Sequence, residues 1–262
     1  MYKRQGSQHV RLNSQQEVYL NFEEPTSVTR VDDLMAITFR DDDKVAFYDA
    51  GSTQPQFTID TGHGSQPVAS ISDGTSLFVA LFGSGEVIRI DPNLRIIQER
   101  VEVGPMPRGM ALHENRLLVT RFISPSTHGE IYDLTISPML TLERTIIANK
   151  VLVNDGLNHG RGVPNFMGSI VISPDGTEAY IPAVKANVDR GTSSVTSGGS
   201  LDDDNTVRPM MVTLDLVNNQ DSNVVPLSPD NSTDFDNQAD PAGITILVDG
   251  CLLYTSPSPR DA

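Results

Sequence analysis

The chain has 262 residues, of which 34 are acidic and 19 basic, so its formal net charge is −15. This charge repels the phosphates of nucleic acids and of anionic membranes, and neither is expected as a partner. No run of 18 apolar residues occurs, which excludes a membrane-spanning helix. The acidity serves solubility or, alternatively, attracts a cationic partner such as a basic redox protein or a metal ion.

The N-terminal residues 1–5 carry the charge of the first region of a signal peptide, but no apolar segment follows them. We therefore expect no signal peptide in this sequence, and we expect the natural start of the protein to lie upstream. Residues 5–23 contain strand-like pieces, which we interpret as the remnant of a preceding structural unit.

Short apolar strands that end in aspartate recur along the chain. Asp49, Asp91 and Asp133 close three such strands at intervals of 42 residues, and a fourth copy ends at Asp215. A second alignment of the third copy gives a period of 44 residues. The sequence therefore contains a repeat of about 42 to 44 residues.

Turn residues recur with a similar period between other apolar strands. These turns are predicted at Asp73–Gly74, Glu114–Asn115 and Asp175–Gly176, because such residues tolerate positive φ angles. Each repeat then contains four strands joined by short connections. No helical periodicity of useful length is present.

Four-stranded units that repeat every 40 to 50 residues are typical of a β-propeller, since one blade buries its apolar faces only against its neighbours. The sequence predicts an all-β fold, a β-propeller of four-stranded antiparallel blades that is incomplete at one or both ends. Residues 1–250 form this partial propeller, with blades near 24–62, 63–104, 105–148 and 162–229, remnant blades at 5–23 and 237–250, and an insertion loop at 185–208.

Three motifs of the second predicted blade resemble the Tyr-Val-Thr-Asn-type (YVTN) propeller repeat of bacterial surface and periplasmic proteins. They are the entry Gly64–Pro67, the turn Ser72–Gly74 and the exit Val87–Asp91. Four later motifs occur in order and are similar to the propeller region found beside c-type cytochrome and di-haem peroxidase-like modules. They are Gly162–Gly168, Ile172–Thr177, Lys185–Gly191 and Asn205–Arg208.

The resemblance covers roughly residues 24–250 and implies an exported protein, periplasmic or extracellular, near an electron-transfer partner such as a c-type cytochrome. It implies no haem in this chain, which lacks the Cys-x-x-Cys-His motif, so that any haem belongs to a missing fused module or to the partner. The main hypothesis is a non-catalytic binding or scaffold module. The alternatives are a metal-dependent, lactonase-like propeller hydrolase and a structural surface-layer repeat protein, so enzymatic activity stays open.

The longest predicted insertion supplies the first group of candidate binding residues. Asn187, Arg190, Asn205 and Arg208 lie on or beside it, and long loops in compact repeats often bind ligands or partners. The alternative is a flexible excursion whose arginines pair with nearby carboxylates.

Further candidates lie at the entries of two predicted blades. Arg108 and Arg161 are close to a proline there, where each can clamp a carboxylate or, alternatively, bond the carbonyls that join two blades. Asn165 follows in the second of these entries. His159 and His63 precede glycines at equivalent positions, where they converge on one site or serve as hydrogen-bonded loop residues.

Acidic triplets offer oxygen ligands for a metal. Asp202, Asp203 and Asp204 are the candidates for Ca²⁺, and Asp41–Asp43 form a second triplet. Neither has the alternating spacing of a known calcium loop, and adjacent carboxylates in a turn point in different directions into water.

The C-terminal segment 251–262 resembles translated sequencing-adapter read-through, a recurrent artefact of metagenomic assemblies. We therefore exclude it from the expected fold. It contains the only cysteine, Cys251, so neither a disulfide nor a thiol nucleophile is expected in the rest of the chain.

Overall fold

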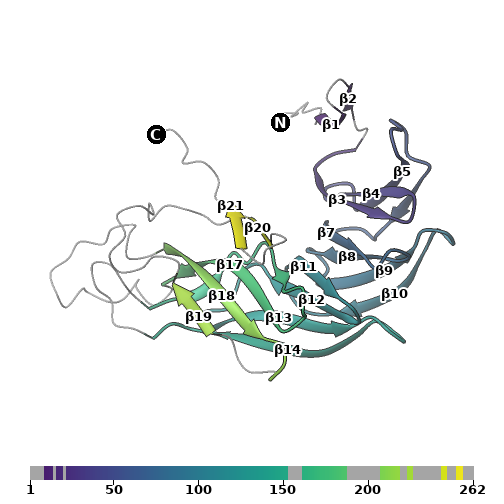
Figure 1. The fold of residues 1–262 in the computed structure, drawn as a ribbon. Coiled ribbons are helices and arrows are strands. Elements are labelled where there is room, and N and C mark those ends of the chain that lie inside the picture. The colour runs from purple at the N-terminus through teal and green to yellow at the C-terminus, as the bar shows by residue number, and fades with distance from the viewer. Residues whose placement is uncertain are drawn as a thin grey trace, which may run out of the picture. The chain divides into compact units, whose positions relative to one another are not determined.

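The structure is a computed structural model that describes residues 9–13, 16–19, 22–152, 161–187, 207–218, 223–226, 243–246 and 252–255 (Figure 1). These ranges contain strands and turns and no helix, so none of their elements is a helix that could cross a membrane. The chain divides into two compact units. The first comprises Met1–Pro107 and Ser137–Leu142, and the second comprises Arg108–Ile136 and Glu143–Ala262.

The first unit contains two four-stranded antiparallel sheets, and in each the strands pair in chain order. The first sheet consists of β3 (Pro25–Val31), β4 (Leu34–Phe39), β5 (Lys44–Asp49) and β6 (Phe57–Asp60). The second consists of β7 (Pro67–Ser72), β8 (Leu77–Leu81), β9 (Glu86–Asp91) and β10 (Ile96–Glu102). A further hairpin joins β1 (His9–Asn13) to β2 (Gln16–Tyr19).

The two sheets of the first unit pack face to face. Every residue of β8 is buried, and Leu77, Val79 and Leu81 share one face of the strand because side chains alternate. They join a hydrophobic core with Val45 and Phe47 of the first sheet. A strand that is covered on both faces needs a continuous apolar sequence, which explains the run Leu77–Leu81.

Hydroxyl groups connect β3 and β7, the first strands of these two sheets. Ser27 Oγ lies 2.8 Å from Ser70 Oγ and 2.7 Å from Thr38 Oγ1, and Thr38 Oγ1 lies 2.9 Å from Thr26 Oγ1. Thr26 Oγ1 donates to the Pro67 carbonyl at 3.0 Å, and Thr29 Oγ1 donates to the Ser70 carbonyl at 2.9 Å. These bonds fix β3 against β7 with polar groups that are all satisfied.

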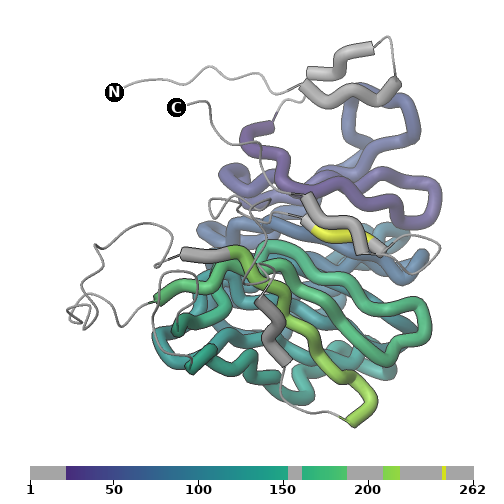
Figure 2. Tube along the Cα trace, turned by 60° about the vertical axis from the view of Figure 1, so that its left-hand side comes forward, coloured from purple at the N-terminus to yellow at the C-terminus, as the bar shows by residue number. Residues whose placement is uncertain are grey.

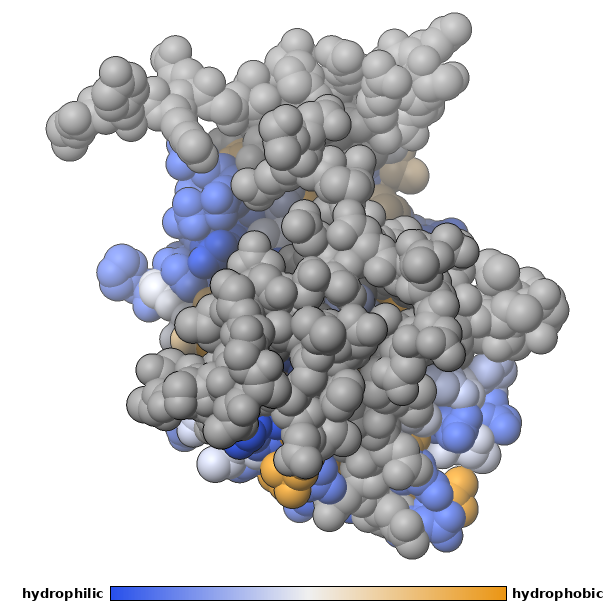
Figure 3. Space-filling view, turned by 90° about the vertical axis from the view of Figure 1, so that its left-hand side faces the viewer, coloured by the Kyte–Doolittle hydropathy of each residue, from blue (hydrophilic) through white to orange (hydrophobic). Residues whose placement is uncertain are grey.

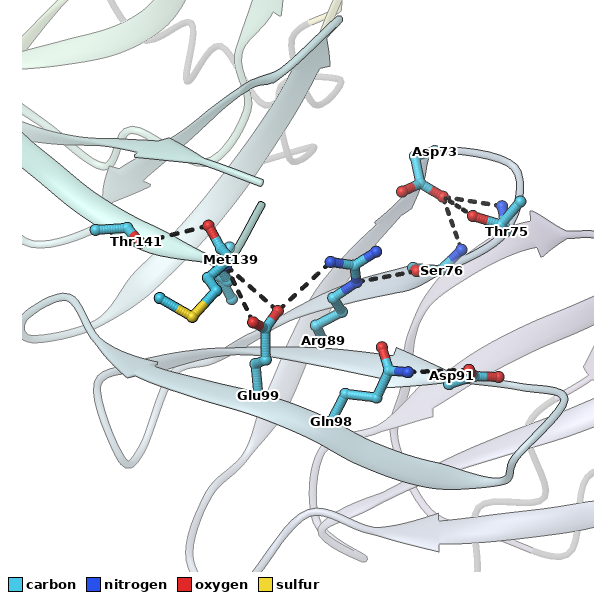
Figure 4. A network of polar contacts seen from close by, with 10 residues as sticks. Asp73, Thr75, Ser76, Arg89, Asp91, Gln98, Glu99, Met139 and Thr141 are labelled. Carbon is cyan, nitrogen blue, oxygen red and sulfur yellow. Dashed lines mark hydrogen bonds and ion pairs between the residues drawn. The ribbon is translucent and has the colours of Figure 1, made fainter. Parts of the chain in front are cut away.

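A second polar network lies at the β9–β10 hairpin of the first unit (Figure 4). Arg89 donates through Nε to Ser76 Oγ at 3.0 Å, and its Nη1 lies 3.5 Å from Glu99 Oε2. Glu99 also accepts a hydrogen bond from the Leu140 backbone N–H at 3.3 Å. Residues 137–142 thereby bind to the outermost strand of the second sheet.

The second unit contains a four-stranded and a five-stranded sheet, whose up-and-down strands are visible in Figure 2. The third sheet consists of β11 (Pro107–His113), β12 (Arg116–Arg121), β13 (His128–Thr135) and β14 (Thr141–Asn149). The fourth consists of β15 (Val163–Asn165), β16 (Val171–Ile172), β17 (Glu178–Ala186), β18 (Val207–Asp215) and β19 (Asn223–Pro226). A last hairpin joins β20 (Gly243–Ile246) to β21 (Leu252–Thr255), which lies inside the segment 251–262.

The third and fourth sheets share one hydrophobic core, to which Leu118 and Ile131 contribute from one sheet and Ile181 and Val212 from the other. Gly109 marks their close approach, because a Cβ atom there would lie 2.8 Å from Ser169 Cα. Its N–H donates to Thr120 Oγ1 at 2.9 Å, and Thr120 Oγ1 donates to the Met167 carbonyl at 2.6 Å. One buried hydroxyl therefore joins β11, β12 and the connection between β15 and β16.

The repeated aspartates are mainly turn residues. Asp91 and Asp215 each accept hydrogen bonds from backbone N–H groups two and three residues further on. Asp175 accepts from Thr177 N at 3.1 Å and from the hydroxyl of Ser173, and these bonds lower the pKa of Asp175 to about 2. Such bonds imitate a backbone turn and explain why aspartate recurs at these positions.

Asp133 has a different role from the other repeated aspartates. Its buried carboxylate accepts from Arg116 Nε at 2.9 Å and Nη2 at 2.7 Å, and from Arg144 Nε at 3.0 Å. Arg116 Nη1 also donates to the Leu216 carbonyl at 3.0 Å, which links the third sheet to the end of β18. This aspartate therefore holds strands together rather than closing a turn.

Three of the sheets begin with the same unusual backbone step. Glu24, Gln66 and Met106 have φ angles of 51°, 52° and 54°, and each directly precedes a proline that starts β3, β7 or β11. Right-handed helical angles are disfavoured before proline, and the left-handed region supplies the sharp change of direction into the strand.

Consecutive antiparallel sheets of about four strands, stacked through apolar faces, are the architecture of a β-propeller. The predicted fold class is confirmed: the chain is all-β and of propeller type. Sequence analysis did not predict the two-residue strand β16, which pairs with β17 only through Val171 and Ile172.

Candidate functional site

The candidate site lies at one end of the strands of the second unit. Val163 of β15 pairs with Ala186 of β17, and Ala186 pairs with Val207 of β18, so these three residues lie at the same end of the fourth sheet. The connection from β12 to β13, residues 122–127, contacts β15 and lies at this end too. Loops that gather at one end of a blade are typical positions for binding residues in propellers.

Two loops of this end are fixed to each other by hydrogen bonds. Asn165 Oδ1 accepts from the backbone N–H groups of Ser124, at 2.9 Å, and Phe166, at 3.0 Å. Ser124 Oγ donates to the Pro164 carbonyl at 2.6 Å. Because these bonds hold both backbones, the side chains that flank Ser124 and Asn165 are held in fixed positions.

Ile123 and Phe166 are next to Ser124 and Asn165 in the sequence. Together with Phe122 and with an arginine of β11 they form what we call the arginine–phenylalanine cluster: Arg108, Phe122, Ile123 and Phe166. The Arg108 guanidinium lies over the Phe122 ring, 4.9 Å from its centroid, and the Phe122 and Phe166 ring centroids are 5.4 Å apart. Ile123 and Phe166 are 39% and 40% exposed. Both are large apolar side chains at the surface of an acidic protein.

Phe166 has a strained backbone, with a φ angle of 52°. A bulky residue in the left-handed region costs on the order of 1–3 kcal/mol and persists only where its surroundings hold it. Here the side-chain oxygen of Asn165 holds the Phe166 backbone by accepting a hydrogen bond from the Phe166 N–H. Glu24, Gln66 and Met106 have nearly the same φ angle at the starts of the other sheets, so this backbone step belongs to the repeat. The exposure of the Phe166 side chain is what makes it a candidate contact residue.

An ion-pair network lies beside the cluster on β12 and β13. Arg121 Nη1 lies 2.7 Å from Glu130 Oε2, and His128 Nε2 lies 3.1 Å from Glu130 Oε1. Partial burial opposes ionisation of Glu130, but the hydrogen bonds and charges of Arg121 and His128 outweigh it and lower the pKa of this carboxyl. Burial, followed by the negative charge of Glu130, raises the pKa of Tyr132 well above its ordinary value.

The lowered pKa of Glu130 predicts a specific acid sensitivity. Glu130 stabilises the fold fully above its ordinary pKa of 4.5, and this contribution is lost as the pH falls through the lower pKa of the folded state. The wild-type chain is therefore expected to lose more stability between about pH 5 and about pH 3 than Glu130→Gln. Urea denaturation at a series of pH values, followed by circular dichroism, measures the difference, and parallel pH profiles for the two proteins would contradict it.

The structure brings several of the predicted site residues to this end of the second unit. Arg108, Arg161, Asn165 and Asn187 lie here, with Asn187 buried directly after β17. Arg208 is on β18, and its backbone pairs with that of Lys185. The other candidates lie outside the described residues: His159, Arg190, Asp202, Asp203, Asp204 and Asn205.

Acidic triplets were the candidates for a metal site, and the described triplet, Asp41–Asp43, lies in the first unit. Asp42 accepts from the Glu23 N–H, and Asp43 accepts from Gly64 N at 2.7 Å and Gln66 N at 2.8 Å. These carboxylates therefore bond backbone groups of loops. His63 is fully exposed, with Nδ1 3.9 Å from Asp43 Oδ2, and the described ranges contain no group of three or more potential metal ligands.

Sequence analysis missed Phe122, Ile123 and Phe166. Phe122 directly follows β12, the second strand of its sheet, whereas Phe166 directly follows β15, the first strand of the next sheet. The two residues do not hold equivalent positions of the repeat, so the repeat pattern contained no signal that their rings would meet.

The chain is similar to two solved structures, of which the first agrees with the propeller-type fold. Hydrazine synthase of Kuenenia stuttgartiensis, a propeller-containing protein, matches 91% of this chain and 75% of its own chain at 13% identity, with a TM-score of 0.51. A chain of the mitotic checkpoint complex matches 64% of this chain at 16% identity and a TM-score of 0.47, and this chain spans 48% of its length. No protein-family model and no curated protein sequence matches the chain.

Proposed function

We propose that this chain is a non-catalytic binding or scaffold module of the propeller type, and that a protein partner docks on the arginine–phenylalanine cluster. One observation carries the proposal: Ile123 and Phe166, both about 40% exposed, are held on two loops that Asn165 and Ser124 lock together. Exposed apolar side chains on a rigid frame gain affinity because little side-chain and loop freedom is lost when a partner binds.

The location and the class of partner come from the resemblance to YVTN repeats and to propellers beside haem modules. The proposed protein is exported, periplasmic or extracellular, and its partner is a c-type cytochrome that carries the haem, either as a separate protein or as a fused module. The net charge of −15 supports a basic partner of this kind, because opposite net charges accelerate encounter.

A pair of surface variants tests the proposed docking face. Ile123→Ser with Phe166→Ser is expected to weaken binding of a purified basic c-type cytochrome about tenfold or more, since apolar contacts at the centre of an interface carry most of its energy. Isothermal titration calorimetry on the full chain measures the affinity.

The matched control is Leu94→Ser with Ile96→Ser, which removes two exposed apolar side chains from the β9–β10 hairpin. This control is expected to bind as the wild-type chain does. An equal loss in both double variants would mean that the docking face is not at the cluster, and no binding by the wild-type chain would refute the cytochrome partner.

Figure 3 shows how polar and apolar residues are distributed on one face of the molecule. Most of the coloured residues are hydrophilic, and the hydrophobic ones occur in separate places. Single exposed apolar residues of this kind need no partner.

A further inference from the structure

In each of the first three sheets a loop joins the second strand to the third, and the third of these loops is the longest. Residues 40–43 join β4 to β5 and residues 82–85 join β8 to β9, and a backbone hydrogen bond closes each of these turns. Residues 122–127 join β12 to β13, and we call them the docking loop because they include Ile123. Residues added to one copy of a repeat lie in loops on one face, which is often the binding face.

One carboxylate holds the residues at both ends of the docking loop. The described backbone pairing of β12 with β13 ends at Thr120 and Ile131, before the loop begins. Beyond this last pair, Glu130 Oε2 lies 2.7 Å from Arg121 Nη1, and Glu130 Oε1 lies 3.1 Å from His128 Nε2. Arg121 is the last residue of β12 and His128 is the first of β13, so the two oxygens of a single side chain connect the ends of the loop.

Both ends of this network continue into the docking loop. Arg121 Nε donates to the Ile123 carbonyl at 2.8 Å, so one guanidinium links the Glu130 carboxylate to the backbone of an exposed apolar residue. At the other end, Thr127 Oγ1 lies 2.8 Å from His128 Nδ1. The position of Ile123 therefore depends on the orientation of Arg121, and Glu130 fixes that orientation.

The ion pair at the docking loop is sheltered from water. The side chains of Arg121 and Glu130 are 20% and 18% exposed, and charge-assisted hydrogen bonds are about twice as strong as neutral ones. A pair of similar chemistry occurs in the first unit, where Arg100 Nη1 lies 3.0 Å from Glu86 Oε2. That pair lies within the backbone-paired part of β9 and β10 and connects the ends of no loop, so it serves as a matched control.

We propose that Glu130 is the positioning residue of the docking loop: its carboxylate holds Arg121 and His128 together and thereby keeps Ile123 in place for the protein partner. This inference rests on the proposed function, to which it adds a residue that acts on the docking face through other side chains. A loop that is ordered before binding loses less conformational freedom when the partner arrives, so the positioning residue contributes to affinity.

Hydrogen exchange of the free full chain, followed by NMR, tests whether Glu130 positions the loop. Glu130→Gln keeps the size of the side chain but replaces one acceptor oxygen with a nitrogen that only donates, so one end of the loop is released. The Ser124 amide, which donates to Asn165 Oδ1, is then expected to exchange about tenfold faster, beyond any change at the Leu118 amide in the middle of β12. A general loss of stability would accelerate both amides by the same factor.

Isothermal titration calorimetry with the purified basic c-type cytochrome measures the consequence for docking. Glu130→Gln is expected to bind the cytochrome about three- to tenfold more weakly than the wild-type chain. In the Ile123→Ser background the same change is expected to alter the affinity little, because the side chain that Glu130 positions is gone. Glu86→Gln is the control and is expected to leave both the Ser124 exchange and the affinity unchanged. Circular dichroism melts establish that all variants are folded.

Equal acceleration at Ser124 and Leu118 would overturn the proposal, as would wild-type affinity in Glu130→Gln. Additive losses of affinity from Glu130→Gln and Ile123→Ser would also overturn it, since a positioning residue acts through the side chain that it positions. The proposed function fails separately: if the wild-type chain does not bind the cytochrome, that partner is wrong, and the exchange measurement decides by itself whether Glu130 positions the loop.

Discussion

Replacing Asp133 with alanine is expected to lower the free energy of unfolding by about 2–4 kcal/mol. The carboxylate is 8% exposed and is the shared acceptor of Arg116 and Arg144, whose side chains are 26% and 34% exposed. Removal of one partner leaves the remaining charges without compensation in a poorly solvated place, and the partial exposure of the arginines reduces the loss from its fully buried value. Urea denaturation followed by circular dichroism measures the change.

Two variants separate this ion-pair role from the turn role of the other repeated aspartates. Asp215→Ala removes only acceptors for the N–H groups of Val217 and Asn218 and the Asn218 side chain, and is expected to have a much smaller effect. Asp133→Asn keeps the shape and loses the charge, and is expected to be nearly as destabilising as alanine. If Asp133→Ala were no worse than Asp215→Ala, the network would contribute nothing measurable.

Thr120→Val is expected to destabilise the second unit by about 2–4 kcal/mol, although the two side chains have the same shape. Thr120 is fully buried, and its hydroxyl accepts from the Gly109 N–H and donates to the Met167 carbonyl. Valine leaves both backbone groups buried without a partner, and each such group costs about 1–3 kcal/mol. Hydrogen exchange of the Gly109 amide, followed by NMR, measures the effect in this unit.

The control is Thr145→Val on β14, where the side chain is exposed. Valine is expected to leave the free energy of unfolding nearly unchanged there, because an exposed hydroxyl is hydrated in both the folded and the unfolded chain. Slow exchange of the Gly109 amide in Thr120→Val, equal to that in the wild-type chain, would show that another acceptor replaces the hydroxyl.

The repeat in the sequence predicted the fold class because its two recurring features are local. Asp91 and Asp215 bond N–H groups two and three residues ahead, and Gly74 and Gly176 adopt the positive φ angles that their turns require. Local chemistry of this kind is encoded within a few residues, and its period revealed four-stranded units.

The candidate site was predicted less completely because its contacts join residues that are far apart in sequence. Arg108 and Asn165 were identified from their place beside prolines, but the stacking of Arg108 on Phe122 and of Phe122 against Phe166 depends on how two sheets pack. The ion pairs of Asp133 depend instead on the pairing of neighbouring strands within one sheet, since Arg116 lies on β12 and Arg144 on β14. Repeat period alone does not distinguish a turn aspartate from one that bridges strands.

The hydroxyl contacts between β3 and β7 have a direction. Each hydroxyl carries one proton, and that of Thr26 goes to the Pro67 carbonyl, so Thr38 donates to Thr26 and Ser27 donates to Thr38. The O–H dipoles therefore align head to tail and polarise one another. The Pro67 carbonyl oxygen thus sets the direction in which each hydroxyl of the series donates. Deleting one hydroxyl frees the orientation of the hydroxyls that donate to it, directly or through another hydroxyl.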